Sequence, residues 1–179
     1  SIDIDTNRLA HACEAGVEAH PYVKTRLIDD EEGHPRQCRN DEEPYYQQVE
    51  IISEAEFMKL KSQLEQPFHL LNDQLFRIRI LKTTGCVYLF IDFHHIIFDG
   101  TSMQILLQDI SSAYENNALQ KETWSGLEVA QEEEKLRLTE NYSMAAEWNK
   151  KVFGALDTTS LPIPDNNSEQ VSIGEYVNR

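Results

Sequence analysis

The residues best suited to chemistry in this chain are two adjacent histidines that end a β-rich run. His94 and His95 directly follow Val87–Phe93, and Asp99 and Gly100 come shortly afterwards. An imidazole exchanges a proton near neutral pH, so a histidine at a strand end can serve as a general base. A glycine after Asp99 can adopt backbone angles that other residues avoid, which allows a sharp turn. The pattern predicts a proton-transfer site at the edge of a sheet.

Strand alternation places the two histidines on different faces, because successive side chains of a strand point to opposite sides. His94 continues a partly polar row. His95 continues an apolar row, which comprises Leu89, Ile91 and Phe93. We therefore expect His95 to be half-buried, and partial burial keeps an imidazole neutral and able to act as a base. This reasoning favours His95 over His94 as the catalytic residue.

Other roles for the histidine pair stay open at this point. The histidines can be purely structural, as a single histidine at a strand end often is. Histidine and aspartate both bind zinc, but a catalytic zinc needs three protein ligands and no third stands at a recognisable spacing. A serine or cysteine nucleophile is not indicated, because the sequence has no G-x-S-x-G motif and no cysteine in a suggestive setting.

Composition excludes several classes of protein. Sixteen basic and 31 acidic residues give a net charge of −15, which disfavours a polyanionic partner such as nucleic acid. No apolar stretch approaches the roughly 20 residues that cross a bilayer, and the amino terminus lacks the pattern of a signal peptide. Cys13, Cys38 and Cys86 are odd in number and widely spaced, so we expect free thiols in a reducing cytoplasm.

Helical periodicity predicts four helices. They are expected at about Thr6–Ala19, from Ser53 to near Pro67, at about Ser102–Asn116, and from about Gly126 or Val129 to Phe153. Asp5 or Thr6 can cap the first helix, and Ser53 with Glu56 forms a capping-box pattern at the second. The predicted apolar face of the third helix comprises Met103, Leu106, Leu107, Ile110 and Tyr114. The last helix is expected to make contacts through Tyr142, Ala145 and Trp148.

Strands are expected where β-rich residues run between turn signals. Tyr22–Ile28 is such a run, and Arg36–Cys38 and Gln47–Ile51 are short strand candidates. Gln74–Leu81 and Cys86–His94 are two further runs that we interpret as a hairpin.

The run HHIIFDG resembles the HHxxxDG signature of condensation domains from nonribosomal peptide synthetases, within the wider chloramphenicol acetyltransferase-like fold. Pro67–Leu70 followed by Gln74–Ile80 resembles the family's PFDL…PLFRxxL segment. Ala19–Arg26 resembles its RHxxLRT segment, and Gly100-Thr101-Ser102 its DGxS continuation. The similarity extends from about Asp5 to about Phe153, and the segments stand in the family's order.

The resemblance implies an α/β lobe: a two-layer sandwich in which a mixed, mostly antiparallel sheet packs against helices. It implies a two-lobed enzyme that joins an acceptor amine to a donor thioester, with both substrates on phosphopantetheine arms of carrier proteins. We expect residues 1–160 to be the amino-terminal lobe and 161–179 a linker and the start of a missing second lobe. This lobe is expected to bind no cofactor itself and to be inactive alone.

The resemblance also assigns roles to residues of the signature. His95 would act as a base on the amine or position it, with His94 as its neighbour in the motif. Asp99 would hold the loop through an ion pair, and Gly100 would let the backbone approach the reacting centre. Ala19 and Lys24 stand where the family has arginines, so the candidate partners of Asp99 are Lys24 and Arg77.

Three alternatives to condensation stay open. A stand-alone coenzyme A-dependent acyltransferase shares the HxxxD chemistry and the fold. An epimerisation domain carries the same signature. A non-catalytic lobe that docks carrier proteins would need neither His95 nor Asp99, and the intact signature speaks against it.

Overall fold

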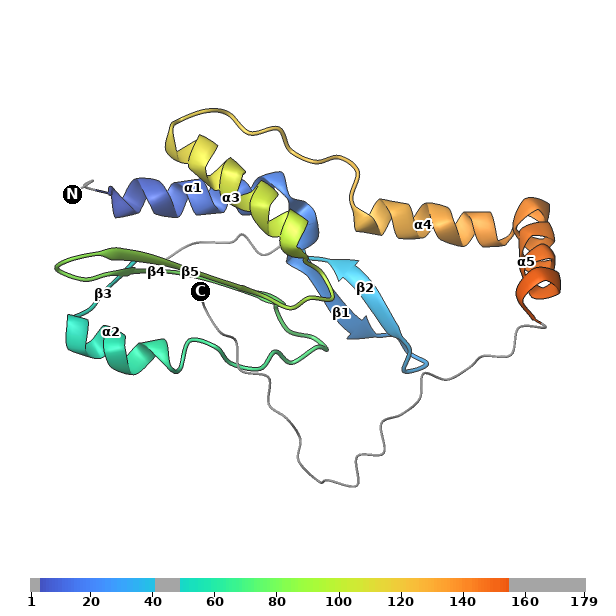
Figure 1. Cartoon of the computed structure of the whole chain (residues 1–179), viewed down its shortest axis with the longest axis horizontal. Coiled ribbons are helices and arrows are strands. Elements are labelled where there is room, and N and C mark those ends of the chain that lie inside the picture. The colour runs from blue at the N-terminus through green and yellow to red at the C-terminus, as the bar shows by residue number, and fades with distance from the viewer. Residues whose placement is uncertain (1–3, 41–48, 155–179) are drawn as a thin grey trace, which may run out of the picture. The chain divides into compact units, whose positions relative to one another are not determined.

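Two antiparallel strands form the centre of the fold in the computed structural model, which describes residues 4–40 and 49–154. β4 (Phe76–Lys82) and β5 (Val87–Phe93) have seven residues each and pair along their whole length (Figure 1). β3 (Val49–Ile51) lies parallel to β4 on its other side. The predicted hairpin is therefore confirmed, and the sheet is mixed and mostly antiparallel, as expected.

Helices cover both faces of this sheet, because its central strands carry apolar side chains on each side. α1 (Thr6–Ala19) and α3 (Gly100–Tyr114) pack together over one face (Figure 1). α2 (Glu54–Lys61) lies on the other face, where the Phe57 ring stacks on Tyr88 with the ring centroids 3.9 Å apart. The α/β class, with a mixed sheet packed against helices, is thus confirmed, whereas the predicted two layers are wrong for the described residues, because α2 adds a layer on the second face.

The interface between α1 and α3 is close-packed around Gly16. A Cβ atom at Gly16 would lie 3.0 Å from Cγ1 of Ile110 and 3.2 Å from Cδ1 of Leu106. Cys13 on the same helix is fully buried, and burial raises the pKa of its thiol to about 12. This thiol is therefore a core residue rather than a nucleophile. All three cysteines are free, as predicted.

The segment after α1 differs from its prediction. Pro21–Lys24 form a turn of 3-10 helix (η1), and the strand β1 (Thr25–Asp29) begins only after it. The fixed φ of proline suits the first position of a helical turn, and the Val23 N–H donates to the His20 carbonyl at 3.0 Å. The first part of the predicted strand is therefore wrong. β1 pairs antiparallel with β2 (Pro35–Arg39), which confirms the second predicted strand.

α2 is shorter than predicted. It begins with the predicted capping box, but it ends at Lys61 rather than near Pro67. The Ser62 hydroxyl donates to the Lys59 carbonyl at 3.2 Å, so a local side-chain bond competes with the next helical turn. Residues 62–75 consequently run outside the helices and named strands.

The last predicted helix is interrupted. α4 (Gly126–Arg137) and α5 (Glu140–Phe153) replace the single helix that was expected to reach Phe153. Thr139 has extended backbone angles, and its side chain accepts a hydrogen bond from the Tyr142 N–H at 3.3 Å. Thr139 therefore caps a new helix instead of continuing the first one.

The backbone forms two compact units, one ending at Glu134 and one beginning at Lys135. In the second unit, α5 contains no buried residue, so the contacts expected from its aromatic side chains are not confirmed. The predicted linker 161–179 and the first two residues of the strand predicted at 47–51 lie outside the described residues.

Arg39, Ser125 and Glu128 tie the start of α4 to β2. Arg39 Nη2 donates to Ser125 Oγ and to Glu128 Oε1, both at 2.8 Å. Glu128 also accepts from the Ser125 hydroxyl and, at 2.8 Å, from the Ser125 N–H. These hydrogen bonds, chiefly those from Ser125, lower the pKa of Glu128 to about 2.

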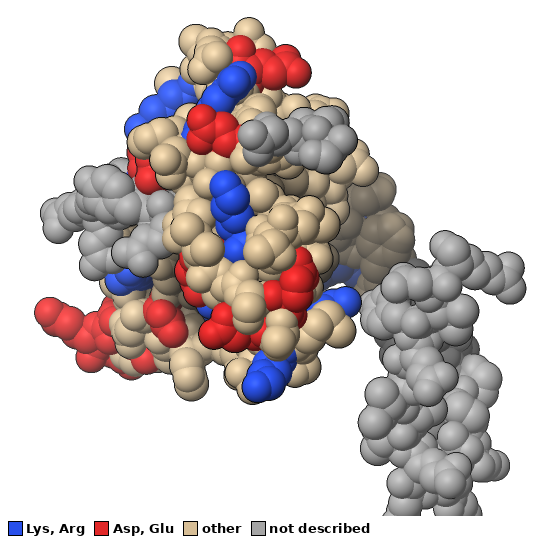
Figure 2. All heavy atoms as spheres, turned by 90° about the vertical axis from the view of Figure 1, so that its left-hand side faces the viewer, with Lys and Arg blue, Asp and Glu red and all other residues tan. Residues whose placement is uncertain are grey.

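Charges on the surface are mixed in sign. On the face shown in Figure 2, acidic and basic side chains are interspersed, with uncharged residues between them. That face therefore presents no broad basic patch to a polyanion. None of the helices in the part of the chain that the structure describes is long and apolar enough to cross a membrane.

Leu106→Ala is expected to destabilise the protein far more than Leu107→Ala. Leu106 is 1% exposed and Leu107 is 43% exposed, although the sequence pattern predicts both on the buried face. Truncating a buried leucine leaves a cavity and costs about 2–5 kcal/mol, whereas an exposed position changes stability by roughly 0.5 kcal/mol or less. Urea denaturation followed by circular dichroism measures both values. Equal losses would contradict the observed orientation of α3.

Acid is expected to remove the stabilisation that Glu128 provides. Its pKa in the fold is about 2 and its ordinary value is 4.5, so this stabilisation is complete above pH 4.5 and is lost as the pH falls toward 2. Glu128→Gln has no carboxyl group at this position that could take up a proton in this pH range. The difference in free energy of unfolding between wild type and this variant should therefore shrink over that range in denaturant titrations. A difference that is independent of pH would contradict the assignment.

Candidate active site

Residues 94–98, here named the signature turn, leave the sheet directly after β5 ends at Phe93. The His94 N–H donates to the Leu75 carbonyl at 2.9 Å, and the Ile97 N–H donates to the His94 carbonyl at 3.1 Å. The Ile97 side chain is buried. Backbone hydrogen bonds therefore fix the start of the turn, and a buried side chain holds it near its end.

Aromatic stacking attaches the end of the signature turn to the sheet. The rings of Phe98 and Phe93 stack with their centroids 3.8 Å apart and their planes at 9°. Phe93 in turn lies 5.7 Å from Phe76 on the neighbouring strand. Aromatic pairs of this kind stabilise by about 0.5–1.5 kcal/mol beyond the area that they bury.

Asp99 caps the amino terminus of α3. Its Oδ1 atom accepts from the Ser102 N–H at 2.8 Å and from the Ser102 hydroxyl at 2.7 Å. These two hydrogen bonds hold the pKa of Asp99 below its ordinary value of 3.8, and the nearby His95 ring acts in the same direction. The carboxylate is therefore ionised at neutral pH and occupied by the helix that it caps.

Gly100 does not use the special backbone conformation that was predicted for it, and its approach to a reacting centre stays a prediction. It is the first residue of α3 and does not have a positive φ, so it needs no backbone conformation reserved for glycine. A Cβ atom built at Gly100 meets nothing within 4 Å. The helix therefore begins two residues earlier than predicted, and the sharp turn that we expected after Asp99 is a helix start.

His95 is exposed rather than half-buried. The prediction assumed that strand alternation continues to His95, but β5 ends at Phe93 and His95 lies in the turn. Among residues 4–40 and 49–154, no group forms a hydrogen bond with the His95 imidazole. Both of its nitrogens are therefore open to a ligand.

His94 is held more firmly than its neighbour. It is half-buried, and its Nδ1 atom accepts a hydrogen bond from the Ile96 N–H at 3.1 Å. Because that nitrogen accepts, it carries no proton, and the proton of the neutral ring lies on Nε2. The Phe68 ring meets the His94 ring edge-on at 6.0 Å between centroids. His94 thus helps to shape the turn that carries His95.

The two cations predicted as partners of Asp99 pair with other carboxylates. Lys24 is buried and forms an ion pair with Glu18. Arg77 forms one with Asp92 at 3.1 Å, directly across the β4–β5 pair. Among the described residues, the expected ion pair of Asp99 is therefore not formed, and the cap hydrogen bonds hold this carboxylate instead.

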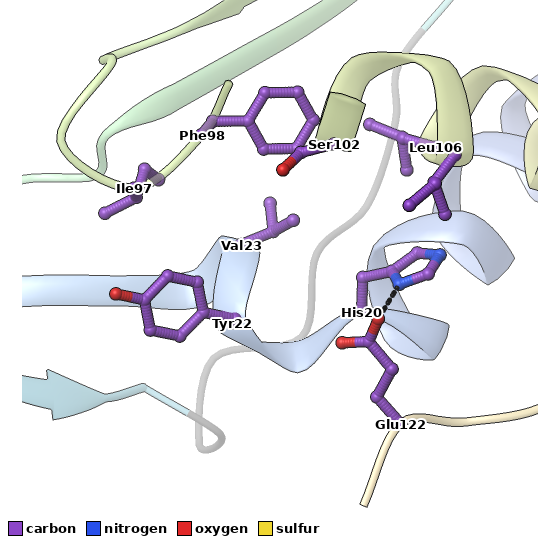
Figure 3. A pocket seen from close by; sticks show the side chains of 9 residues that line it. His20, Tyr22, Val23, Ile97, Phe98, Ser102, Leu106 and Glu122 are labelled. Carbon is purple, nitrogen blue, oxygen red and sulfur yellow. Dashed lines mark hydrogen bonds and ion pairs between the residues drawn. The ribbon is translucent and has the colours of Figure 1, made fainter. Parts of the chain in front are cut away.

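His20 stands between two carboxylates beside the signature turn. Its Nε2 atom lies 2.7 Å from Asp109 Oδ2 and its Nδ1 atom 2.7 Å from Glu122 Oε1, the second contact being drawn in Figure 3. The side chain of His20 is 13% exposed. Sequence reasoning missed this cluster, because its acidic members lie 89 and 102 residues further along the chain and leave no local pattern.

A pocket of about 100 Å³ lies between this histidine and the signature turn. Figure 3 shows Ile97 and Phe98 of the turn on one side of the pocket and Tyr22 and His20 on the other. Ser102 lines the same pocket and also holds Asp99. The pocket and the turn therefore share a wall, and a group bound in one would contact residues that fix the other.

The arrangement suits proton transfer at His95. The turn is fixed by backbone hydrogen bonds, by stacked rings and by a helix cap, so the imidazole is presented from a defined backbone position. A positioned histidine contributes typically about 10²–10⁴-fold to a rate by general acid–base catalysis. The chemistry open to this site is therefore removal of a proton from a bound amine, hydroxyl or similar group.

The comparisons with known proteins agree on one family. The family model described as "Condensation domain" matches residues 1–176. One of the plipastatin synthase proteins of Bacillus subtilis (strain 168) is 29% identical over 161 residues, which cover 89% of this chain and 4% of that protein. Gramicidin S synthase 2 of Brevibacillus brevis is 30% identical over 119 residues, which cover 65% of this chain and 3% of that protein. The chain thus spans a small part of the curated relatives that it matches.

A solved structure agrees in fold. The epimerization domain from the third module of tyrocidine synthetase B superposes with a TM-score of 0.66 at 22% identity, over 89% of this chain and 39% of that one. At this identity the similarity demonstrates a common fold and no more. Together with the family model, which matches almost the whole sequence, it leads to one conclusion: the chain belongs to the condensation-domain family of nonribosomal peptide synthetases.

Proposed function

We propose that this chain is the amino-terminal lobe of a condensation domain that forms an amide bond between carrier-bound thioesters, with His95 as the base or positioning residue. One observation carries the proposal: the His95 imidazole is exposed and has no hydrogen-bond partner among the described residues, although the turn beneath it is fixed. A histidine that is free in this way is available to a substrate.

The proposed reaction conserves atoms and charge. The nitrogen of the acceptor amine attacks the carbonyl carbon of the donor thioester, so that a C–N bond forms and the C–S bond breaks. His95 accepts a proton from the attacking nitrogen or orients that nitrogen, and the departing sulfur leaves as a thiolate that takes up a proton. His94 supports the turn. Asp99 holds the start of α3 and does not contact the substrate.

The proposal includes partners that supply the substrates. Phosphopantetheine arms on carrier proteins would deliver both thioesters, and a second lobe would close over His95 and exclude water. We place the lobe at residues 1–160 and the connection to its partner lobe at 161–179. Because His95 is exposed in this chain, we expect the chain to be inactive alone. We propose the cytoplasm as the compartment, as for synthetases that use cytosolic substrates.

A coenzyme A-dependent acyltransferase is the second candidate. The same exposed imidazole would serve it, since deprotonation of an acceptor and attack on a thioester are common to both reactions. The two candidates differ in the thiol that carries the donor, a carrier-protein arm in one case and free coenzyme A in the other. Epimerisation and a purely docking role have no observation on the described residues that favours them over condensation.

His95→Ala should reduce amide formation by about 10²-fold or more when it is placed in the synthetase that contains this chain. The assay supplies donor and acceptor carrier proteins that are loaded with their amino acids, and product is measured by mass spectrometry in single turnovers. His11→Ala is the matched control. His11 is an exposed histidine on α1 whose ion pair with Glu14 lies at the surface, and such pairs contribute little.

Other results would redirect the assignment. Undiminished condensation by folded His95→Ala would make the signature structural and overturn the proposed role. A wild type that is silent with loaded carriers but consumes free acyl-coenzyme A would favour the stand-alone acyltransferase. Equal losses in His95→Ala and His11→Ala would point to a general defect instead of a missing base.

A further inference from the structure

Arg77 contacts three kinds of group from its position on β4. Its guanidinium donates to Asp92 Oδ2 at 3.1 Å, to the Gln66 carbonyl at 2.5 Å and to the Pro67 carbonyl at 3.0 Å. Its Cζ atom also lies 3.8 Å from the centroid of the Phe68 ring. One cation therefore binds a carboxylate, two backbone carbonyls and an aromatic face.

These contacts matter because residues 62–75 run outside the helices and named strands and lack a regular ladder of hydrogen bonds. Backbone carbonyls in such a segment need donors from elsewhere. The Asn72 N–H donates to the Leu27 carbonyl at 2.7 Å, which attaches the later part of the segment to β1. Arg77 attaches the beginning of the segment, at Gln66 and Pro67, to β4. An arginine suits this task because its planar group has five donors in a fixed arrangement.

The segment that Arg77 holds carries Phe68 to the signature turn. Phe68 is half-buried, with its face under the guanidinium and its ring nearly perpendicular to the His94 ring, at 88°. His94 also accepts the hydrogen bond from the Ile96 N–H. The His94 ring thus contacts both a ring held by Arg77 and a backbone donor next to His95.

We propose that Arg77 is a positioning residue for the histidine pair, acting through Phe68 and His94. The guanidinium fixes Phe68, Phe68 fixes the orientation of the His94 ring, and His94 fixes the Ile96 N–H of the turn that presents His95. The consequence for catalysis rests on the proposed function of His95, whereas the chain of contacts does not. This role differs from the ion pair with Asp99 that the family resemblance implied for Arg77.

Arg79 supplies a matched control. It lies two positions further along β4, on the same side of the strand, and its guanidinium donates twice to Glu50, at 2.8 Å each time. Its contact with Glu50 is shorter than the contact of Arg77 with Asp92. Arg79 pairs with a residue of β3, however, whereas Arg77 pairs with a residue of β5, the strand at the other edge of β4. Exchanging either arginine for lysine keeps the charge and removes the planar set of donors.

The first test is structural and uses this chain as it is. In wild type and Arg79→Lys, nuclear Overhauser effects should connect the ring protons of Phe68 and His94, and the Ile96 amide should be protected from exchange. In Arg77→Lys, the ring contacts should be lost and the Ile96 amide should exchange faster. Retention of both signals in folded Arg77→Lys would overturn the proposal, whatever the activity of the protein.

The second test measures the consequence for the reaction in the intact synthetase. Arg77→Lys should lower kcat on the order of 10-fold with little change in KM for the loaded carriers, because misplacing a catalytic group impairs the chemical step. Arg79→Lys should lose less than twofold. Phe68→Leu, which keeps the carbonyl contacts available, should reproduce the loss, and the double variant with Arg77→Lys should add little.

The two tests separate failure of this proposal from failure of the proposed function. Additive losses for Arg77→Lys and Phe68→Leu would show that the residues act independently, and this would overturn the chain of contacts. If the ring contacts behave as expected but His95→Ala retains full activity, the positional link stands and the role of His95 falls. Should Arg77→Lys fail to fold, Phe68→Leu still reports the exchange rate of the Ile96 amide and kcat, and wild-type values for both would overturn the proposal.

Discussion

The antiparallel pairing of β4 with β5 is the constraint on which the rest of the structure depends. Every residue of β5 has a fixed partner, from Val87 opposite Lys82 to Phe93 opposite Phe76. Side-chain alternation then sends one row of β5 toward α1 and α3 and the other toward α2. A shift of one residue would exchange the two rows, so burial on both sides fixes the register. The register in turn fixes where the strand ends and the signature turn begins.

Helix capping completes what strand pairing begins. Asp99 satisfies the first turn of α3 through Ser102, and α3 packs on α1 so closely that Gly16 leaves no room for a side chain without displacement. The same carboxylate therefore ends the signature turn and caps the helix that follows it. Phe98 adds a stacked contact to Phe93 just before the cap. The turn is consequently bounded on both sides by elements that the hydrophobic core holds in place.

The features that could be predicted from the sequence are those that neighbouring residues determine. The bounds of α1, its Asp5 cap and the β4–β5 hairpin follow from periodicity and from local hydrogen bonding, and the structure confirms them. The exposure of His95 could not be predicted, because alternation gives no information about where a strand ends. Contacts between distant residues also escaped prediction: His20 with Asp109 and Glu122 is one case. Spacing along the sequence does not indicate which distant carboxylate a basic side chain will contact.

The signature turn and the Asp99 that follows it therefore combine two kinds of residue that a single activity assay would not distinguish. Ile97, Phe98 and Asp99 hold the turn by burial, stacking and capping, and each uses its side chain for that purpose. His95 is the member of the histidine pair whose polar atoms have no such use among the described residues. Loss of activity after a change at a holding residue is thus expected even if that residue never contacts a substrate. Only a variant that leaves the turn in place and removes the free imidazole would isolate the proposed chemistry, which is why the proposed function is tested at His95.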